Sequence, residues 1–401
     1  MKPEFVTGNV VRGDDLCGRD REFEEIIRVL KKDSVLVKAP RRYGKTSLMN
    51  KVHEHLEVEQ TSFFFDVEGL ESPEDFISMI LGTVLEKMPP ERRLTFAQFR
   101  GRLGELLAGI DEFEIANFRV RLKEAIRDDW QEQGKALFEL LVKLEAPVLI
   151  IVDEFPALLD NMRSQPETAR IFLQWFRSIR LNSKLKNVRW VLAGSLAIEV
   201  AVKRVGAGYE TINDLSPVVV GAFSDSVAVE FIKALIATDG NLEEIDDDCA
   251  RFVLEKIGSG VPYFIQVLLK ESRNLALKEG AKAITEEIVQ RAYDESVLGP
   301  THRTYFAYYY GRLARDLDVR QAAVAKEIVL AIARKRQMPE EDVEKLLVKH
   351  SRGELTDDEL NAIMAYIEDE FYVEYVSPER VYRFSTNLLR DWWLRYHDHI
   401  N

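Results

Sequence analysis

The sequence predicts an α/β protein whose parallel β-sheet is covered by helices on both faces. Short apolar runs typical of buried parallel strands recur along the first half of the chain, at residues 34–38, 61–67, 147–152, 188–193 and 218–221. Segments with the apolar spacing of helices separate these runs. After about residue 223 the strand pattern stops and charged helical segments follow. Strands that alternate with helices imply a parallel sheet with helices on both faces.

The composition is that of a globular chain with little use of cysteine. The 401 residues are 46% hydrophobic, enough for two or three domains with hydrophobic cores. Cys17 and Cys249 are the two cysteines, which is too few for a disulfide framework or a cysteine-based zinc site. We therefore expect a cytoplasmic protein, without a signal peptide or a membrane span. The His-x-His pairs at 53–55 and 397–399 are expected to be solvated, because residues i and i+2 of a helix do not share a face.

The net charge limits the partners that this chain can bind. A net charge of -13 repels polyphosphate at long range, so nucleic-acid binding would need a local basic patch. One group of cations lies between the third and fourth predicted strands, at Arg177, Arg180, Lys184, Lys186 and Arg189. We expect this group to form a solvated helix face and loop.

The C-terminal region predicts a hairpin after a pair of helices. The residues Thr356-Asp-Asp-Glu359 form a capping box, which starts a helix running to about Glu370. The β-rich runs 371–376 and 380–384 flank the turn-like Ser377-Pro-Glu379 and indicate a β-hairpin. Another helix is expected to begin at Pro339. Helix, helix and hairpin follow one another in this order in a winged helix-turn-helix.

The most specific motif is Ala39-Pro-Arg-Arg-Tyr-Gly-Lys-Thr-Ser47, between the first predicted strand and the next helix. It matches the phosphate-loop pattern Gly-x-x-x-x-Gly-Lys-Ser/Thr except at its first position. In such a loop the backbone N–H groups and the helix N-terminus point at a phosphate, and Gly44 lets the backbone pass close to it. Lys45 would reach the β- and γ-phosphates, and the hydroxyl of Thr46 would ligate Mg²⁺.

Ala39 stands where the pattern has its first glycine. This replacement costs little if the residue keeps an extended backbone, and the following Pro40 favours that conformation. A chance occurrence of Gly-Lys-Thr is the alternative. The predicted strand before the loop and the helix after it argue against chance.

A second motif ends the third predicted strand in two carboxylates. The apolar run Val148-Leu-Ile-Ile-Val152 leads directly to Asp153 and Glu154, which is the form of a Walker B motif. Asp153 would hold Mg²⁺, and Glu154 would orient and deprotonate the water that attacks a γ-phosphate. The alternative is a pair of acids that cap a helix at the end of a strand.

With both motifs placed, the chain resembles the prokaryotic P-loop ATPases of the AAA-related STAND class, in the archaeal-ATPase-like family. The resemblance runs from about Phe5 to the C-terminus and rests on residues 18–22, 39–47, 149–154, 191–195, 260–262 and 384–393. It implies an ASCE/AAA-type NTPase domain with a parallel sheet, a helical lid and a winged-helix-like domain. Their expected ranges are residues 1–222, with a helical insertion at about 73–145, then 223–298 and 299–401.

The resemblance also implies roles for single residues. Gly18 and Arg19 resemble the loop that packs near adenine, and Ser195 matches the sensor of the γ-phosphate. Pro262, in the Gly-x-Pro element of the lid, would lie against the base or ribose. The remaining loop residues would contact the nucleotide: Pro40, Arg41, Arg42, Tyr43 and Ser47.

Some of these positions keep a second reading. Ser195 could equally cap the following helix. Gly260-Val-Pro262 could be a plain helix break. The sequence does not choose an arginine finger among Arg41, Arg42 and Arg204.

Three functions are consistent with these motifs. The first is a molecular switch that binds and hydrolyses ATP, with ATP or ADP and Mg²⁺ as cofactors, and that signals to an unidentified protein partner or assembles as a nucleotide-dependent homo-oligomer. The second is an origin-recognition-type DNA-binding ATPase. The third is an interaction protein stabilised by nucleotide without turnover, against which Glu154 argues.

Charge separates the first two functions. Residues 356–370, the helix that should enter a DNA groove, carry six acids and no base. The predicted hairpin offers only Arg380 and Arg383. We therefore expect the C-terminal module to bind protein in preference to DNA.

Overall fold

The computed structural model describes residues 3–6, 10–57, 61–87, 115–139, 141, 147–194 and 198–398. Contacts within the chain divide it into two units. The sheet unit comprises residues 22–38 and 48–219, and the helical unit comprises residues 1–21, 39–47 and 220–401. The phosphate-loop segment therefore belongs, by its contacts, to the helical unit.

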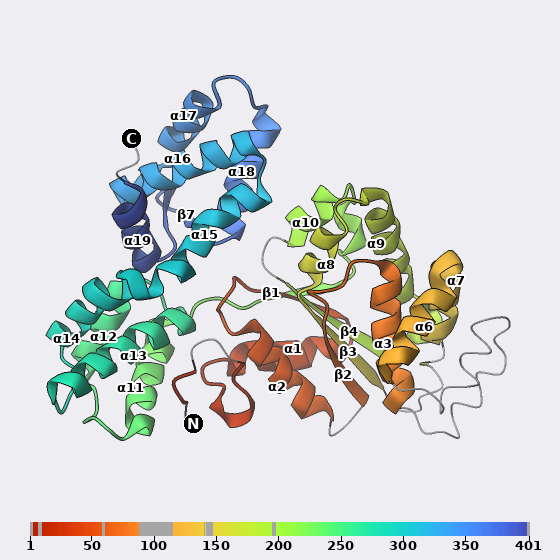
Figure 1. Ribbon diagram of the computed structural model, residues 1–401, viewed down its shortest axis with the longest axis horizontal. Helices are drawn as coiled ribbons and strands as arrows, with labels where there is room; N and C mark the ends of the chain where they lie inside the picture. Colours follow the sequence, from red (N-terminus) through yellow and green to blue (C-terminus); the bar gives the residue numbers. More distant parts are fainter. Residues whose placement is uncertain are drawn as a thin grey trace. The chain divides into compact units, whose positions relative to one another are not determined.

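Five parallel strands form the centre of the sheet unit (Figure 1). The order in the sheet is β2-β3-β4-β1-β5, with bounds Val35–Lys38 (β1), Thr61–Asp66 (β2), Val148–Asp153 (β3), Val188–Gly194 (β4) and Ser216–Val219 (β5). All five predicted strands are confirmed, although the fifth starts two residues earlier than expected. Every residue of β3 is buried, as expected for a strand covered on both faces.

One face of this sheet is covered by a core rich in aromatic residues. The helices on this face include α3 (Pro73–Lys87), α8 (Phe155–Asn161), α9 (Pro166–Arg180) and α10 (Ile198–Arg204). Phe76 of α3 lies 5.2 Å from Phe172 and 5.1 Å from Phe176, measured between ring centroids. Phe176 in turn meets Trp190 of β4 edge to face at 4.9 Å. Such edge-to-face pairs stabilise a core beyond their buried area alone.

The helices α1 (Asp20–Leu30) and α2 (Lys45–Glu57) lie on the opposite face (Figure 1). His53 of α2 faces the sheet, with its Nδ1 2.7 Å from the hydroxyl of Ser62 and its ring 6.2 Å from that of Phe64. His397 is also half-buried and stacks on Tyr310 with ring centroids 3.7 Å apart. The prediction that the His-x-His pairs are solvated was wrong for these two histidines, since a neighbouring strand or helix covers the face on which each one lies. His55 is exposed, as predicted, and His399 lies outside the described residues.

The stretch predicted to be a helical insertion contains helices where the structure describes it. Besides α3, it contains α6 (Ile115–Ile126) and α7 (Trp130–Glu139), joined by a short 3-10 turn. Residues 88–114, 140 and 142–146 lie outside the described part of the chain. The Ser72 hydroxyl accepts the backbone N–H of Asp75 at 3.2 Å, so Ser72 caps α3 as predicted.

The helical unit begins its C-terminal half with α11 (Asp225–Asp239), α12 (Asp247–Ile257), α13 (Pro262–Glu279) and α14 (Glu286–Arg291). The expected break after Ile257 is confirmed. Gly258 ends α12 with a left-handed φ of 79°, and Pro262 is the first residue of α13.

A three-stranded antiparallel sheet and five further helices complete this unit (Figure 1). The sheet has the order β6-β8-β7. In chain order the elements are α15 (Arg303–Asp316), α16 (Val319–Lys335), β6 (Gln337–Pro339), α17 (Glu340–Ser351), α18 (Asp357–Asp369), β7 (Val373–Val376), β8 (Val381–Phe384) and α19 (Asn387–His397). The predicted hairpin is confirmed as β7 and β8.

The short strand β6 was not predicted. It has three residues, of which only Met338 is buried, and a strand of this length is too short for an alternating pattern to identify it in the sequence. Pro339 ends β6 and is the N-cap of α17, which begins at Glu340, one residue later than expected. A proline is tolerated there because β6 lies at the edge of its sheet.

The capping box of α18 is confirmed and provides a stability test. The Thr356 hydroxyl accepts the N–H of Glu359 at 3.4 Å, and the Glu359 carboxylate accepts the N–H of Thr356 at 2.7 Å. We expect Thr356→Ala to lower the free energy of unfolding by about 1 kcal/mol, because an N–H at the helix start loses its acceptor. Urea denaturation of the whole chain measures this, with Thr356→Ser as the control that keeps the hydroxyl. Equal stability of the alanine and serine variants would contradict it.

Among the helices in the described residues, we find none that combines the length and apolar character required to cross a membrane.

Candidate functional site

Both sequence motifs start at the same edge of the sheet. The loop 39–44 follows β1, and Asp153 ends β3. Both strands are hydrogen-bonded to β4, which lies between them, and all three run parallel. The carboxyl ends of parallel strands meet at one edge, which is where open α/β sheets bind their ligands.

The phosphate-loop segment adopts a backbone that an ordinary loop avoids. Gly44 has φ 85°, and a Cβ placed on it would meet nothing within 4 Å, so the glycine is required by its backbone angle. Arg42 is left-handed as well, with φ 71°, a conformation that is costly for a residue with a side chain. Helix α2 then begins at Lys45, with no acidic residue in its first turn to offset the positive end of its dipole.

Arg19 fixes the peptide group that precedes Gly44. Its Nη2 donates to the carbonyl oxygen of Tyr43 at 2.7 Å, and its guanidinium lies 4.5 Å from the ring centroid of Phe223. The side chain is only 1% exposed. In a planar trans peptide the C=O and the following N–H point in opposite directions, so Arg19 turns the N–H of Gly44 to the far side. An anion binding to this loop would meet that N–H.

Phe223 connects the other elements that the resemblance assigned to the base and the lid. Its N–H donates to the carbonyl of Gly260 at 2.9 Å, and a Cβ at Gly260 would lie 2.3 Å from the Phe223 carbonyl oxygen. A Cβ at Gly18 would lie 2.8 Å from the Phe223 ring. The structure thus brings Gly18, Arg19 and the Gly260-Val-Pro262 element together around this phenylalanine. No pattern in the sequence distinguishes Phe223 from other core aromatic residues.

The carboxylate pair at the end of β3 has an unusual backbone. Asp153 is 2% exposed, and its Oδ1 accepts the N–H of Glu154 at 2.8 Å. Glu154 is left-handed, with φ 57° and ψ 35°, and it is the N-cap of α8 without making a capping hydrogen bond from its side chain. The helix-capping alternative is therefore not realised at Glu154. A left-handed residue with a side chain stores strain of the kind that concentrates at functional sites.

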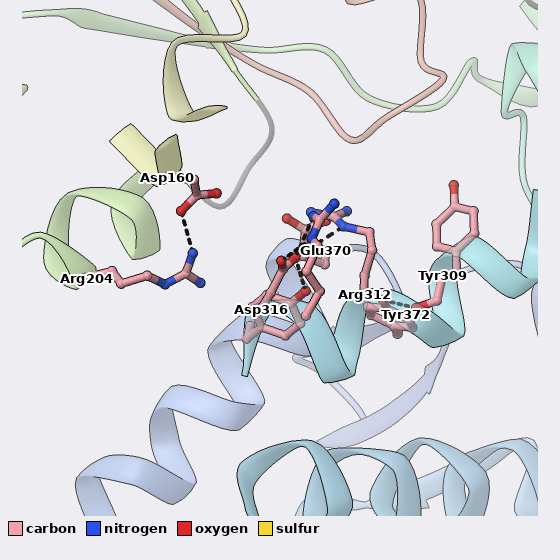
Figure 2. A network of polar contacts seen from close by, with 9 residues as sticks. Asp160, Arg204, Tyr309, Arg312, Asp316, Glu370 and Tyr372 are labelled. Carbon is pink, nitrogen blue, oxygen red and sulfur yellow. Dashed lines mark hydrogen bonds and ion pairs between the residues drawn. The ribbon is translucent and has the colours of Figure 1, made fainter. Parts of the chain in front are cut away.

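Three further residues were predicted to belong to the nucleotide site or to supply the arginine finger. The Ser47 hydroxyl accepts the N–H of Val11 at 3.1 Å and so holds the N-terminal segment. Ser195 lies outside the described residues. Arg204, one of the arginine-finger candidates, donates from Nη1 to Asp160 at 2.5 Å (Figure 2).

The bulky loop residues have their side chains against aromatic rings of the helical unit. Arg41 lies 5.5 Å from the ring of Tyr308, and Arg42 lies 4.8 Å from that of Tyr263. Tyr43 meets Phe371 edge to face at 4.9 Å. Burial raises the pKa of the Tyr43 hydroxyl well above its usual range, so this side chain is uncharged. Sequence reasoning gave these residues only a nucleotide contact and missed their aromatic partners.

The donor groups of each motif suit a magnesium-bound nucleotide. The Thr46 hydroxyl and the Asp153 carboxylate are hard oxygen donors of the kind that Mg²⁺ takes from proteins. Lys45 is 7% exposed and lies at the first position of α2, where a cation adds to the helix dipole.

Comparison with known proteins supports the fold. No protein-family model and no curated protein matches the chain. Among solved structures, the Walker-type ATPase of Pyrococcus abyssi is similar with a TM-score of 0.61 at 16% identity, covering 97% of this chain and 99% of that chain. The ORC2 protein of Aeropyrum pernix, solved as ADPNP–ADP complexes, is similar with a TM-score of 0.57 at 12% identity, covering 99% of this chain and 96% of that one.

The chain has the fold of a P-loop ATPase. The likeness extends over nearly the full length of both compared structures, so it includes the C-terminal region as well as the sheet. The predicted α/β class, with a parallel sheet followed by helices and a C-terminal module, is confirmed.

Proposed function

We propose that this chain binds and hydrolyses ATP and couples its nucleotide state to a rearrangement that a partner protein detects. The observation that carries this proposal is the shape of the loop after β1. Arg19 and the positive φ of Gly44 set the peptide group that leads into α2, as a phosphate-binding loop requires. The nucleotide complexes in which the similar ORC2 protein was solved support ATP and ADP as the ligands here.

In this proposal the loop residues Pro40 to Ser47 bind the phosphates, with Lys45 as their cation. Thr46 and Asp153 hold Mg²⁺, which neutralises charge that develops on the transferred phosphoryl group. Glu154 orients the attacking water and takes its proton. Ser195 detects the γ-phosphate.

The base and ribose would meet the group gathered at Phe223, namely Gly18, Arg19 and Pro262. We assign the ATPase domain to residues 1–222, the lid to 223–298 and the output module to 299–401. A change in nucleotide would then alter the lid, and with it the surface that a partner protein or a second copy of the chain recognises. This is the STAND type of switch.

The likeness to an ORC2 protein favours a second candidate, a DNA-binding ATPase of the origin-recognition type. The charges of the C-terminal module argue against it. The exposed face of α18 consists of Asp357, Asp358, Asn361, Ala362 and Ala365. Groove-reading helices present cations or amides to bases and phosphates, and only Asn361 is of that kind.

Several of the cations that could compensate are paired with acids of the chain. In the hairpin, Arg380 lies 2.7 Å from Glu340, and Arg383 is bonded to Glu374. Between β3 and β4, the almost fully buried guanidinium of Arg180 lies 2.8 Å from Asp214.

Two further cations of the basic group between β3 and β4 are also ion-paired. Arg177 lies 3.7 Å from Asp214, and Lys184 lies 2.9 Å from Glu139. Phosphate contacts from these groups would require breaking existing ion pairs, so the gain from counterion release is small.

Titration of a DNA duplex across a range of salt concentrations decides between the two candidates. We expect a dissociation constant weaker than about 1 μM at physiological salt, because an anionic surface releases few counterions. The titration is made with and without ATP, and the Lys45→Ala chain is the control for any effect of nucleotide. Nanomolar binding of the duplex with a steep dependence on salt would overturn the proposal of a molecular switch. Weak binding, together with a change in size or hydrogen exchange between the ATP and ADP states, supports it.

A further inference from the structure

The side chains of the phosphate loop contact parts of the chain more than two hundred residues away. Tyr43 and Arg42 meet rings of α13, α15 and the turn after α18. All of these residues belong to the helical unit. In a loop of this kind the backbone N–H groups bind the phosphates, with the side chains of Lys45 and Thr46, so the side chains of Arg42 and Tyr43 can contact the protein.

Tyr43 is held through its ring. The residue is 2% exposed, and its ring plane stands at 82° to that of Phe371. Its hydroxyl is buried and makes no hydrogen bond to any described residue. Tyr43 lines a cavity of about 10 Å³, together with Phe371, Arg312 and Glu370. The side chain is therefore held by packing, in which Phe371 is an aromatic partner.

The partner ring has a fixed position. Phe371 is left-handed, with φ 66°, between two anchored neighbours. Glu370 is 5% exposed and bonded to Arg312 of α15, and the hydroxyl of Tyr372 donates to the Tyr309 carbonyl at 2.7 Å (Figure 2). Buried charged contacts of this kind are costly to break. The turn at residues 370–372 therefore keeps its position where the Tyr43 ring contacts it.

Arg42 needs support for a different reason. Its φ of 71° is unfavourable for a residue with a side chain. The guanidinium lies 4.8 Å from the ring of Tyr263 and 5.5 Å from that of Tyr305. Cation–π contacts at these distances are attractive and offset the strained backbone.

We propose that Tyr43 and Arg42 are positioning residues, through which Phe371 and Tyr263 hold the phosphate loop in its binding shape. This inference rests on the proposed function and adds a coupling route to it. Nucleotide affinity then depends on rings far along the chain from the loop. By thermodynamic reciprocity, bound nucleotide stabilises the turn at Phe371 by the same factor.

The test is the dissociation constant of Mg·ADP, measured by calorimetry on the full chain. We expect Tyr43→Ala and Phe371→Ala each to weaken binding about threefold to tenfold, the worth of one aromatic pair. Tyr43→Phe should bind like the wild type, because the hydroxyl has no partner to lose. The double variant Tyr43→Ala/Phe371→Ala should bind like either single variant, since both remove one interaction.

Two measurements separate positioning from mere packing. Tyr263→Ala removes a half-buried ring and should also weaken binding through Arg42. Hydrogen exchange at the amides of residues 370–372 should slow when Mg·ADP binds to the wild type, and slow less in Tyr43→Ala. A ring that only packs the fold would leave both readouts unchanged.

The outcomes are distinct from those of the proposed function. Wild type that binds no nucleotide would overturn the proposed function and this inference with it. Wild type that binds, with Phe371→Ala and Tyr263→Ala binding equally well, would overturn the inference alone. If the double variant lost affinity for Mg·ADP by the sum of the two single losses in binding free energy, the inference would also be overturned, because independent effects on folding add.

Discussion

Replacement of Lys45 by alanine should remove most of the affinity for Mg·ATP. Lys45 is the first residue of α2 and directly follows Gly44, so it is the one cation that the loop pattern itself places at the phosphates. Loss of one partner from a desolvated, hydrogen-bonded charge pair costs about 2–5 kcal/mol. This corresponds to a dissociation constant about 30-fold to several thousandfold higher, measured by calorimetry.

Lys51→Ala is the matched control for this prediction. Lys51 is also on α2, and its amine lies over the ring of Phe23 at 5.1 Å, so we expect no effect on nucleotide binding. An unchanged affinity in Lys45→Ala would refute the phosphate-loop assignment. Equal losses in both variants would indicate damage to the helix instead of a lost phosphate contact.

Replacement of Glu154 by glutamine should separate binding from hydrolysis. Glutamine keeps the shape and polarity of the side chain but cannot take a proton. We expect the rate of phosphate release at saturating ATP to fall about 10²–10⁴-fold, the usual worth of a positioned base, with little change in ATP affinity. The carboxylate of Glu167, on α9 and paired with Arg170 at 2.5 Å, provides the control variant Glu167→Gln.

Glu154→Gly adds a second readout at the same position. A glycine adopts the observed φ of 57° without strain, so this variant should unfold at higher denaturant while also losing hydrolysis. Wild-type turnover in Glu154→Gln would mean that another residue orients the water. Loss of ATP binding in both variants would assign Glu154 to the binding of the nucleotide.

The parts of the molecule that could be predicted are those with a local signal. The apolar run of β3, the Ser72 cap and the box at Thr356 each lie within a few residues of what they determine. The two motifs are local in the same sense. Their spacing along the chain indicates the chemistry, and the neighbouring strand and helix indicate where it takes place.

What could not be predicted depends on partners that are distant in the sequence. Nothing near Tyr43 shows that its ring meets Phe371, or that Arg19 bonds its carbonyl. The sequence motif that ends in Asp153 and Glu154 does not indicate that Glu154 has a left-handed backbone, because the surrounding fold imposes this strain. His397 was misjudged because Tyr310, the residue that covers it, comes from another helix.

The division of the chain into two units predicts how the protein responds to proteolytic cleavage. The backbone passes between the two units four times, after residues 21, 38, 47 and 219. A nick near residue 219 therefore leaves the loop 39–47 tied by its contacts to the released half while its peptide bonds remain with the other half. We therefore expect that neither half folds alone as it does in the intact chain, and that the two halves stay associated after the cut.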